Sequence, residues 1–151
     1  MEIVWNVVDT DQRIEFLQKY FGQFNDACIK EFKYESGSYV NPDGSMKPHD
    51  SERKAYLIIQ KQNKVRPVVE FMFEGVERAN IVPSPVNYDS MLSGILLERK
   101  DGFIFFATAI VTIDSLERSS DWVTWIKAKS VKWREAPQYI GDATVYVHKD
   151  L

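Results

Sequence analysis

The spacing of apolar residues changes from a strand period to a helix period near the start of the chain. Alternation over residues 3–8 predicts a short first strand. Four apolar residues then recur at helical spacing around Leu17, which predicts a helix with one apolar stripe. Asp9 is the expected N-cap, with Gln12 three residues later, and Gly22 is the expected stop. We predict a single N-terminal helix.

Beyond this helix the pattern has period two and predicts only strands. The sequence NPDG at residues 41–44 is a strong turn signal. Asp101 and Gly102 separate two apolar runs and predict a type I′ hairpin turn. The expected strands cover residues 28–40, 55–62, 68–74, 76–82, 94–100, 103–109, 122–134 and 143–148.

One of these runs is apolar on both of its faces. Residues 103–111 carry Phe, Ala and Val on one face and Ile, Phe and Thr on the other. Such a strand belongs inside a sheet, covered on both sides. We expect the N-terminal helix to cover one side and the curved sheet itself to cover the other. The prediction is an α+β chain, mainly β, with about eight strands in a curled antiparallel sheet or a sandwich. No linker divides residues 1–151, so we expect one domain.

Composition and charge narrow the classes of partner. The net charge of −3 and the pI of about 5.4 argue against a general nucleic-acid binder. The longest uncharged apolar run, residues 102–113, has 12 residues against the roughly 20 of a membrane helix. The start has an acidic residue where a signal peptide has basic ones, and a lone cysteine forms no intrachain disulfide. We expect a cytoplasmic protein with no nucleic-acid or membrane partner.

The inventory of catalytic motifs is thin. Phosphate-binding glycine loops, a nucleophile elbow and a zinc-protease motif are all missing from the sequence. Its two histidines, His49 and His148, lie in polar surroundings and are expected to be solvated. Cys28 is expected to be a small buried side chain. Acidic and basic residues alternate over residues 31–35, which predicts an ordinary outer face. We therefore expect no catalytic residue, cofactor or metal.

The late strand at residues 122–134 has four basic residues and no acidic one. Alternation places Trp125, Lys127, Lys129 and Trp133 on one face of a regular strand. If this face is exposed, the tryptophans would anchor a partner and the lysines would attract an acidic protein. The alternative, which we favour, is that both tryptophans belong to the core and the lysines lie at a strand edge or a bulge.

Two short runs carry a resemblance to a known group of proteins. They are YFGQFNDACI at residues 20–29 and FMFEGV at residues 71–76. In these runs the chain resembles small immunity proteins of bacterial polymorphic-toxin systems and their uncharacterised relatives. The resemblance covers the first half of the chain. Asn25 stands where that group commonly has histidine, so no role of that histidine carries over.

The resemblance implies a β-rich domain that neutralises a toxin by direct contact, without enzymatic activity. Two alternatives stay open. A small-molecule carrier would enclose an apolar pocket lined by Phe105, Phe71 and Trp5. An enzyme of unrecognised type would gather titratable groups around His49.

Overall fold

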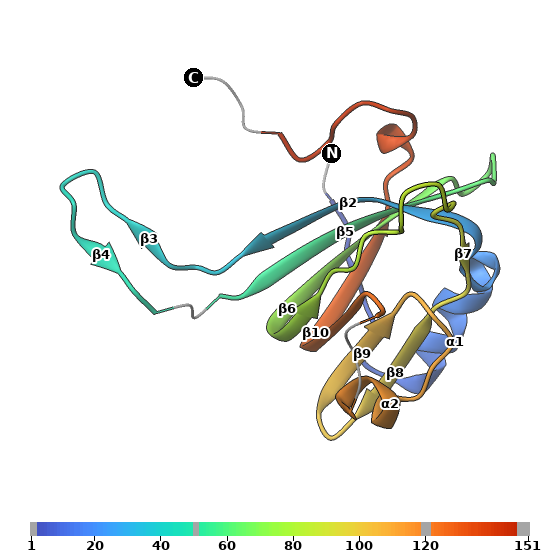
Figure 1. Cartoon of the computed structure of the whole chain (residues 1–151), viewed down its shortest axis with the longest axis horizontal. Helices are drawn as coiled ribbons and strands as arrows, with labels where there is room; N and C mark the ends of the chain where they lie inside the picture. Colours follow the sequence, from blue (N-terminus) through green and yellow to red (C-terminus); the bar gives the residue numbers. More distant parts are fainter. Residues whose placement is uncertain (1–2, 50–51, 119–121, 148–151) are drawn as a thin grey trace.

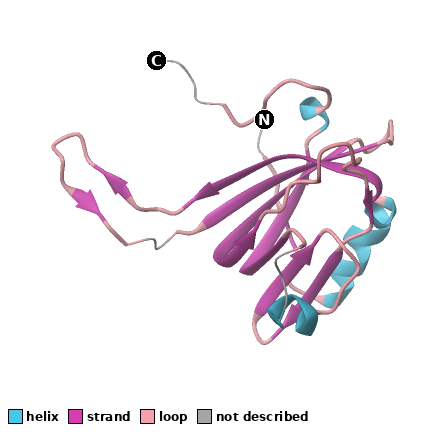
Figure 2. Ribbon diagram, in the orientation of Figure 1, coloured by secondary structure: helices cyan, strands magenta, loops and turns pink. Residues whose placement is uncertain are grey.

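A computed structural model describes residues 3–49, 52–118 and 122–147 of the chain. Strands outweigh helices in the described chain, and the helical segments are short and lie near its periphery (Figure 2). In chain order the elements are β1 (Asn6–Val7), α1 (Asp11–Tyr20), η1 (Gly22–Phe24), β2 (Asn25–Glu35), β3 (Tyr39–Val40), β4 (Met46–Lys47), β5 (Lys54–Lys61), β6 (Val68–Asn80), β7 (Leu92–Ser93), β8 (Leu96–Lys100), β9 (Phe103–Ala107), α2 (Ile113–Arg118), β10 (Trp125–Glu135) and η2 (Pro137–Tyr139).

The strands form one curled antiparallel sheet, as the sequence predicts (Figure 1). Its order is β7-β2-β5-β6-β10-β9-β8, and β1 also pairs with β10. The predicted hairpin is confirmed: β8 and β9 pair, and both Asp101 and Gly102 have positive φ, as a type I′ turn requires. Strands β3 and β4 form a separate hairpin that projects beyond the ends of β2 and β5 (Figure 1).

The concave, inner face of the sheet packs on α1 and forms the main core. Leu17 and Phe21 are fully buried there against inner-face side chains such as Phe71. The helix is capped by Thr10 and not by Asp9, because the Thr10 hydroxyl accepts the backbone N–H of Arg13 at 3.1 Å. Asp9 instead pairs with the Arg13 guanidinium. The predicted helix is therefore present, with its cap one residue later than expected.

A second apolar cluster lies on the opposite, outer face at β9 and the start of β10. Ile113 and Leu116 of α2 cover Phe105 and Trp125. The sequence prediction that both faces of the β9 run are covered is confirmed, but the cover of the outer face is α2 and not the curved sheet. The strand also ends at Ala107, earlier than expected.

Strand β10 changes the face to which its side chains point. Ile126 and Ala128 belong to the inner face, and so do Val131 and Trp133, although the two pairs have opposite parity in the sequence. The reversal lies at Lys129, opposite Gly75 of β6, which has a φ of +64°. The β6–β10 register also shifts between Lys127 and Ala128. That shift places one extra residue, Glu77, in β6 and leaves Ile126 and Ala128 on the same face. The register is unchanged across Lys129, so the reversal in β10 coincides with the left-handed backbone of Gly75 and not with the shift.

The chain after β10 crosses the outer face of the sheet without forming another ladder strand. Residues 143–147 are not a strand, contrary to expectation, and His148 lies outside the described residues. Val145 and Tyr146 pack on a small outer-face cluster that includes Ile58 and Val68. Within the described ranges, no helix is both long enough and apolar enough to span a bilayer.

Candidate functional site

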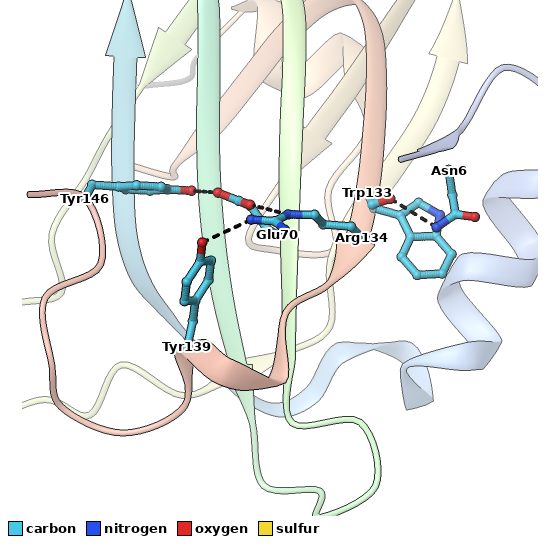
Figure 3. Close-up of polar contacts among 6 residues, drawn as sticks. All are labelled: Asn6, Glu70, Trp133, Arg134, Tyr139 and Tyr146. Carbon is cyan, nitrogen blue, oxygen red and sulfur yellow. Dashed lines mark hydrogen bonds and ion pairs between the residues drawn. The ribbon is translucent and has the colours of Figure 1, made fainter. Parts of the chain in front are cut away.

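A buried carboxylate lies at the centre of the outer face. Glu70 is only 3% exposed and comes from the middle of β6, between the inner-facing Val69 and Phe71. One carboxylate oxygen accepts from Nε of Arg134, its neighbour on β10, at 2.7 Å. The other oxygen accepts the hydroxyl of Tyr146 (Figure 3). A buried charge is tolerated when it is paired and hydrogen-bonded in this way.

The arginine has further partners that hold its guanidinium in place. Its NH2 group donates to the Tyr139 hydroxyl at 3.1 Å (Figure 3). The guanidinium also lies over the rings of Trp5, at 5.2 Å, and Tyr139, at 5.5 Å. These contacts join the first strand region, β6, β10 and the C-terminal segment into one polar network.

Burial alters the titration of the tyrosine in this network. The pKa of the Tyr146 hydroxyl is raised, mainly by its removal from water, and further by its hydrogen bond to Glu70 and the negative charge there. Tyr146 therefore stays a neutral donor at physiological pH. Both Glu70 oxygens accept from donors of the same chain, so the carboxylate is not free to act as a general base.

The C-terminal segment is held over this network mainly through its backbone. The Glu31 carboxylate accepts the backbone N–H groups of Val145 and Tyr146 at 2.7 and 2.8 Å. The Gln60 amide donates to the carbonyls of Tyr139 and Gly141 at 2.8 and 2.9 Å. This outer-face site was not predicted from the sequence.

The predicted partner-binding residues do not form one surface. Trp125 is 3% exposed beneath α2 on the outer face, whereas Trp133 is 6% exposed in the main core on the inner face. The expectation that they share a face is wrong, because the side-chain direction of β10 reverses between them at Lys129, opposite the left-handed Gly75. Both are buried, as the favoured alternative held. Its lysines, however, do not lie at a sheet edge, because β10 pairs with β6 on one side and with β9 and β1 on the other. Lys127 lies instead beside the register shift of the β6–β10 pair.

The two lysines of that set also differ from each other. Lys127 lies over the rings of Phe103 and Phe105, at 4.6 and 5.4 Å, and its ammonium is 3.6 Å from Glu117. Lys129 is exposed and its stem lies over Gly75. Lys129 alone of the four presents an open side chain at the surface of the described chain.

The remaining candidates are placed as follows. Cys28 is half-buried and lines a cavity of about 370 Å³ with Lys61 and Met91, so it is not the fully buried residue that was expected. Burial lowers the pKa of the Lys61 ammonium, which donates to the carbonyl of Asn25 at 2.7 Å. His49 is exposed. Across the described part of the chain, no three His, Cys, Asp or Glu side chains are grouped to hold a metal ion.

The charged alternation of β2 does lie on the outer face, as predicted. Glu31, Lys33 and Glu35 pair with the outer-face residues of β5, and Lys33 bonds Glu35 at 2.8 Å. Glu31, however, is more than a solvated side chain, because it holds the backbone of the C-terminal segment.

The pocket proposed for a carrier is not present in the expected form. Phe71 is in the inner-face core, whereas Phe105 is in the outer-face cluster beneath α2. Trp5 lies under Arg134. The sheet separates Phe71 from Phe105 and from Trp5, so the three side chains cannot line one cavity.

The projecting hairpin is the second surface of interest, and we call residues 37–49 the arm. Its tip is fixed by the Asp43 carboxylate, which accepts from the backbone and hydroxyl of Ser45 at 2.9 and 2.6 Å. Those bonds lower the pKa of Asp43. Tyr39, Val40 and Met46 are 54%, 58% and 63% exposed on this ordered hairpin.

Comparison of the chain with protein-family models, curated proteins and solved structures finds no match to any of them. The geometry of the chain itself therefore has to support any functional conclusion.

Proposed function

We propose that the chain is a non-enzymatic protein-binding domain that acts as an immunity protein, contacting a toxin through its arm. The observation that supports this proposal is the arm itself. Three large apolar side chains, Tyr39, Val40 and Met46, are each more than half exposed on a projecting hairpin. Val40 and Met46 are paired across the hairpin and form one exposed apolar patch, which is typical of interaction sites, and Tyr39 adds an exposed aromatic ring on the opposite face.

The order of the arm favours binding over simple flexibility. The turn is closed by Asn41 N–H to the Ser45 carbonyl at 2.7 Å, and by the Asn41 amide to the Ser45 hydroxyl at 3.0 Å. At the base, a Cβ at Gly37 would lie 2.7 Å from Cβ of Glu52, so the two chain segments approach closely there. A preorganised hairpin loses less conformational entropy on binding than a flexible loop.

The partner we propose is a protein. The resemblance at residues 20–29 and 71–76 favours a toxin, and the net charge of −3 argues against nucleic acid. A non-enzymatic role is supported by the carboxylate of Glu70, whose two oxygens are both occupied within the chain.

The test uses the product of the reading frame adjacent to the gene of this chain. We expect that product to inhibit growth, and we expect co-expression of this chain to restore growth. Titration calorimetry should show that Tyr39→Ala with Met46→Ala weakens the complex at least tenfold, because aromatic anchors dominate protein interfaces.

The matched control replaces a tyrosine and a methionine of the body. Tyr88 and Met91 are also exposed, and Tyr88→Ala with Met91→Ala should leave the affinity unchanged. The proposal is wrong if the neighbouring product is harmless or does not bind this chain. The arm is excluded as the contact surface if both double variants bind as the parent does.

A further inference from the structure

Side chains on the outer face of the sheet bind the C-terminal segment mainly through the backbone groups of that segment. Glu31 accepts two successive backbone N–H groups, and Gln60 donates to two backbone carbonyls. Lys30 also donates to the carbonyl of Asp142 at 3.1 Å. Side chains that bind backbone groups in this way are able to hold a segment of varied sequence, here one that is bent at Val145 and Tyr146.

Two side chains of the segment are recognised specifically. Val145 packs on the apolar cluster of Ile58, Val68 and Ala136. The Tyr146 ring meets Tyr56 edge-on at 6.3 Å, and the ammonium of Lys33 lies 5.9 Å from its centroid. Its hydroxyl donates to Glu70, which Arg134 holds from the other side (Figure 3). The surface therefore selects an apolar residue followed by a tyrosine.

We propose that this surface is a docking surface for a short segment of a partner protein that carries an apolar residue followed by tyrosine. In the free chain it is occupied by the chain's own Val145 and Tyr146. The occupant defines the chemistry of the ligand: a bent backbone that directs two successive N–H groups at Glu31, one apolar side chain and one phenol that donates to a buried carboxylate. This docking surface is on the outer face of the sheet, apart from the arm, so the inference does not rest on the arm's function.

The present occupant is suited to exchange. Residues 141–144, which lead into it, are exposed, and the segment pairs with no strand of the sheet. A tethered segment competes with an outside ligand at an effective concentration in the millimolar range. A partner that binds this docking surface would displace Val145 and Tyr146 and leave the sheet intact.

The experiment measures binding of a synthetic, dye-labelled peptide with the sequence of residues 142–147 by fluorescence anisotropy, to full-length variants. We expect the affinity to be highest for Tyr146→Ala, intermediate for Tyr146→Phe and lowest for the parent, because each substitution weakens the competing segment. Tyr88→Ala should bind as the parent does. The same peptide with phenylalanine in place of tyrosine should bind about tenfold more weakly, since it cannot donate to Glu70.

A second peptide keeps only the valine and the tyrosine and has alanine elsewhere. It should bind within a few-fold of the first, because the other contacts are to backbone. The arm variant Tyr39→Ala with Met46→Ala should take up both peptides as the parent does, which separates a failure here from a failure of the arm.

Three results would overturn the proposal. One is a lack of peptide binding to the Tyr146→Phe variant, which keeps the aromatic ring and its packing. Another is equal binding of the tyrosine and phenylalanine peptides. The third is a concentration-dependent dimer of the parent chain that is lost in the Tyr146→Ala variant. Such a dimer would assign the docking surface to a second copy of the chain.

Discussion

Glu70 is the residue whose environment departs furthest from what its type leads one to expect. A glutamate in the middle of a strand is usually solvated, yet Glu70 is almost fully buried. Its charge is balanced by Arg134, whose side chain is 13% exposed. Removing one partner of a buried pair leaves the other charge without compensation, and this is the costly change in such pairs.

This reasoning leads to a prediction for Glu70→Gln. Arg134 would lose its counter-charge while keeping one hydrogen bond, so we expect a loss of about 3 kcal/mol in the free energy of unfolding, measured by urea titration. The control is Glu35→Gln, which breaks the exposed pair with Lys33 and should cost at most about 1 kcal/mol. Equal losses in the two variants would show that the buried pair does not hold the outer face together.

The raised pKa of Tyr146 predicts how stability changes in alkaline solution. In the unfolded chain this phenol ionises at an ordinary pKa of about 10, whereas in the folded chain it keeps its proton. The unfolded state therefore loses a proton that the folded state retains, and the free energy of unfolding falls as the pH rises above about 10. Below that pH the stabilising contribution of the group is fully present.

The variant Tyr146→Phe removes this titration. We expect it to be less stable than the parent at pH 8 by about 1 kcal/mol, through loss of the hydrogen bond. The difference in the free energy of unfolding should shrink between pH 10 and pH 11. Only the parent has the Tyr146 phenol, so only the parent loses the stability that its proton contributes. Tyr88→Phe, which changes an exposed tyrosine, should follow the parent at every pH. A constant difference between the parent and Tyr146→Phe would contradict the assigned burial of the phenol.

At the scale of elements, α1 is the clearest case of a segment that tertiary packing stabilises. Leu17 is fully buried in the main core, whereas Phe16 beside it in the same helix is 57% exposed. We expect Leu17→Ala to cost about 3 kcal/mol, from lost burial and the cavity left behind. Phe16→Ala should cost less than about 1 kcal/mol. The midpoints of thermal unfolding would test this, and similar midpoints for the two variants would mean that α1 does not dock as described.

The elements differ in how much of them the sequence predicts. The β8–β9 hairpin was predicted closely, because its turn residues Asp101 and Gly102 and its alternation are local signals. Helix α2 was missed because its six residues supply a single apolar pair, Ile113 and Leu116. Thr112 does give a signal, since its hydroxyl accepts the backbone N–H of Ser115 at 3.1 Å, as an N-cap does.

The candidate site depends on relations that no local pattern contains. Arg134 and Tyr146 are 64 and 76 residues from Glu70 in the sequence, so only the folded sheet brings them together. The faces of Trp125 and Trp133 were assigned wrongly for a related reason. Periodicity assumes a regular strand, and the reversal at Lys129, opposite the left-handed Gly75, breaks that assumption.

For the whole molecule, the important feature is that one sheet carries apolar clusters on both of its faces. The main core lies between the sheet and α1, and the second cluster lies between the sheet and α2. Strand β9 contributes Phe106 to the first and Phe105 to the second. Neither cluster can lose its strands without exposing part of the other, so the chain should unfold as one cooperative unit.

This arrangement predicts how substitutions in the two clusters combine. Leu17 and Leu116 are both buried and belong to different clusters on opposite sides of the sheet. Because they share no cluster, the costs of Leu17→Ala and Leu116→Ala should add to within about 0.5 kcal/mol in the double variant. Each variant should still show a single urea transition that is the same by tryptophan fluorescence and by circular dichroism. Trp133 lies in the main core and Trp125 in the second cluster, so fluorescence responds to the loss of either one. A fluorescence transition that differs from the circular dichroism transition would show that the α2 side unfolds independently.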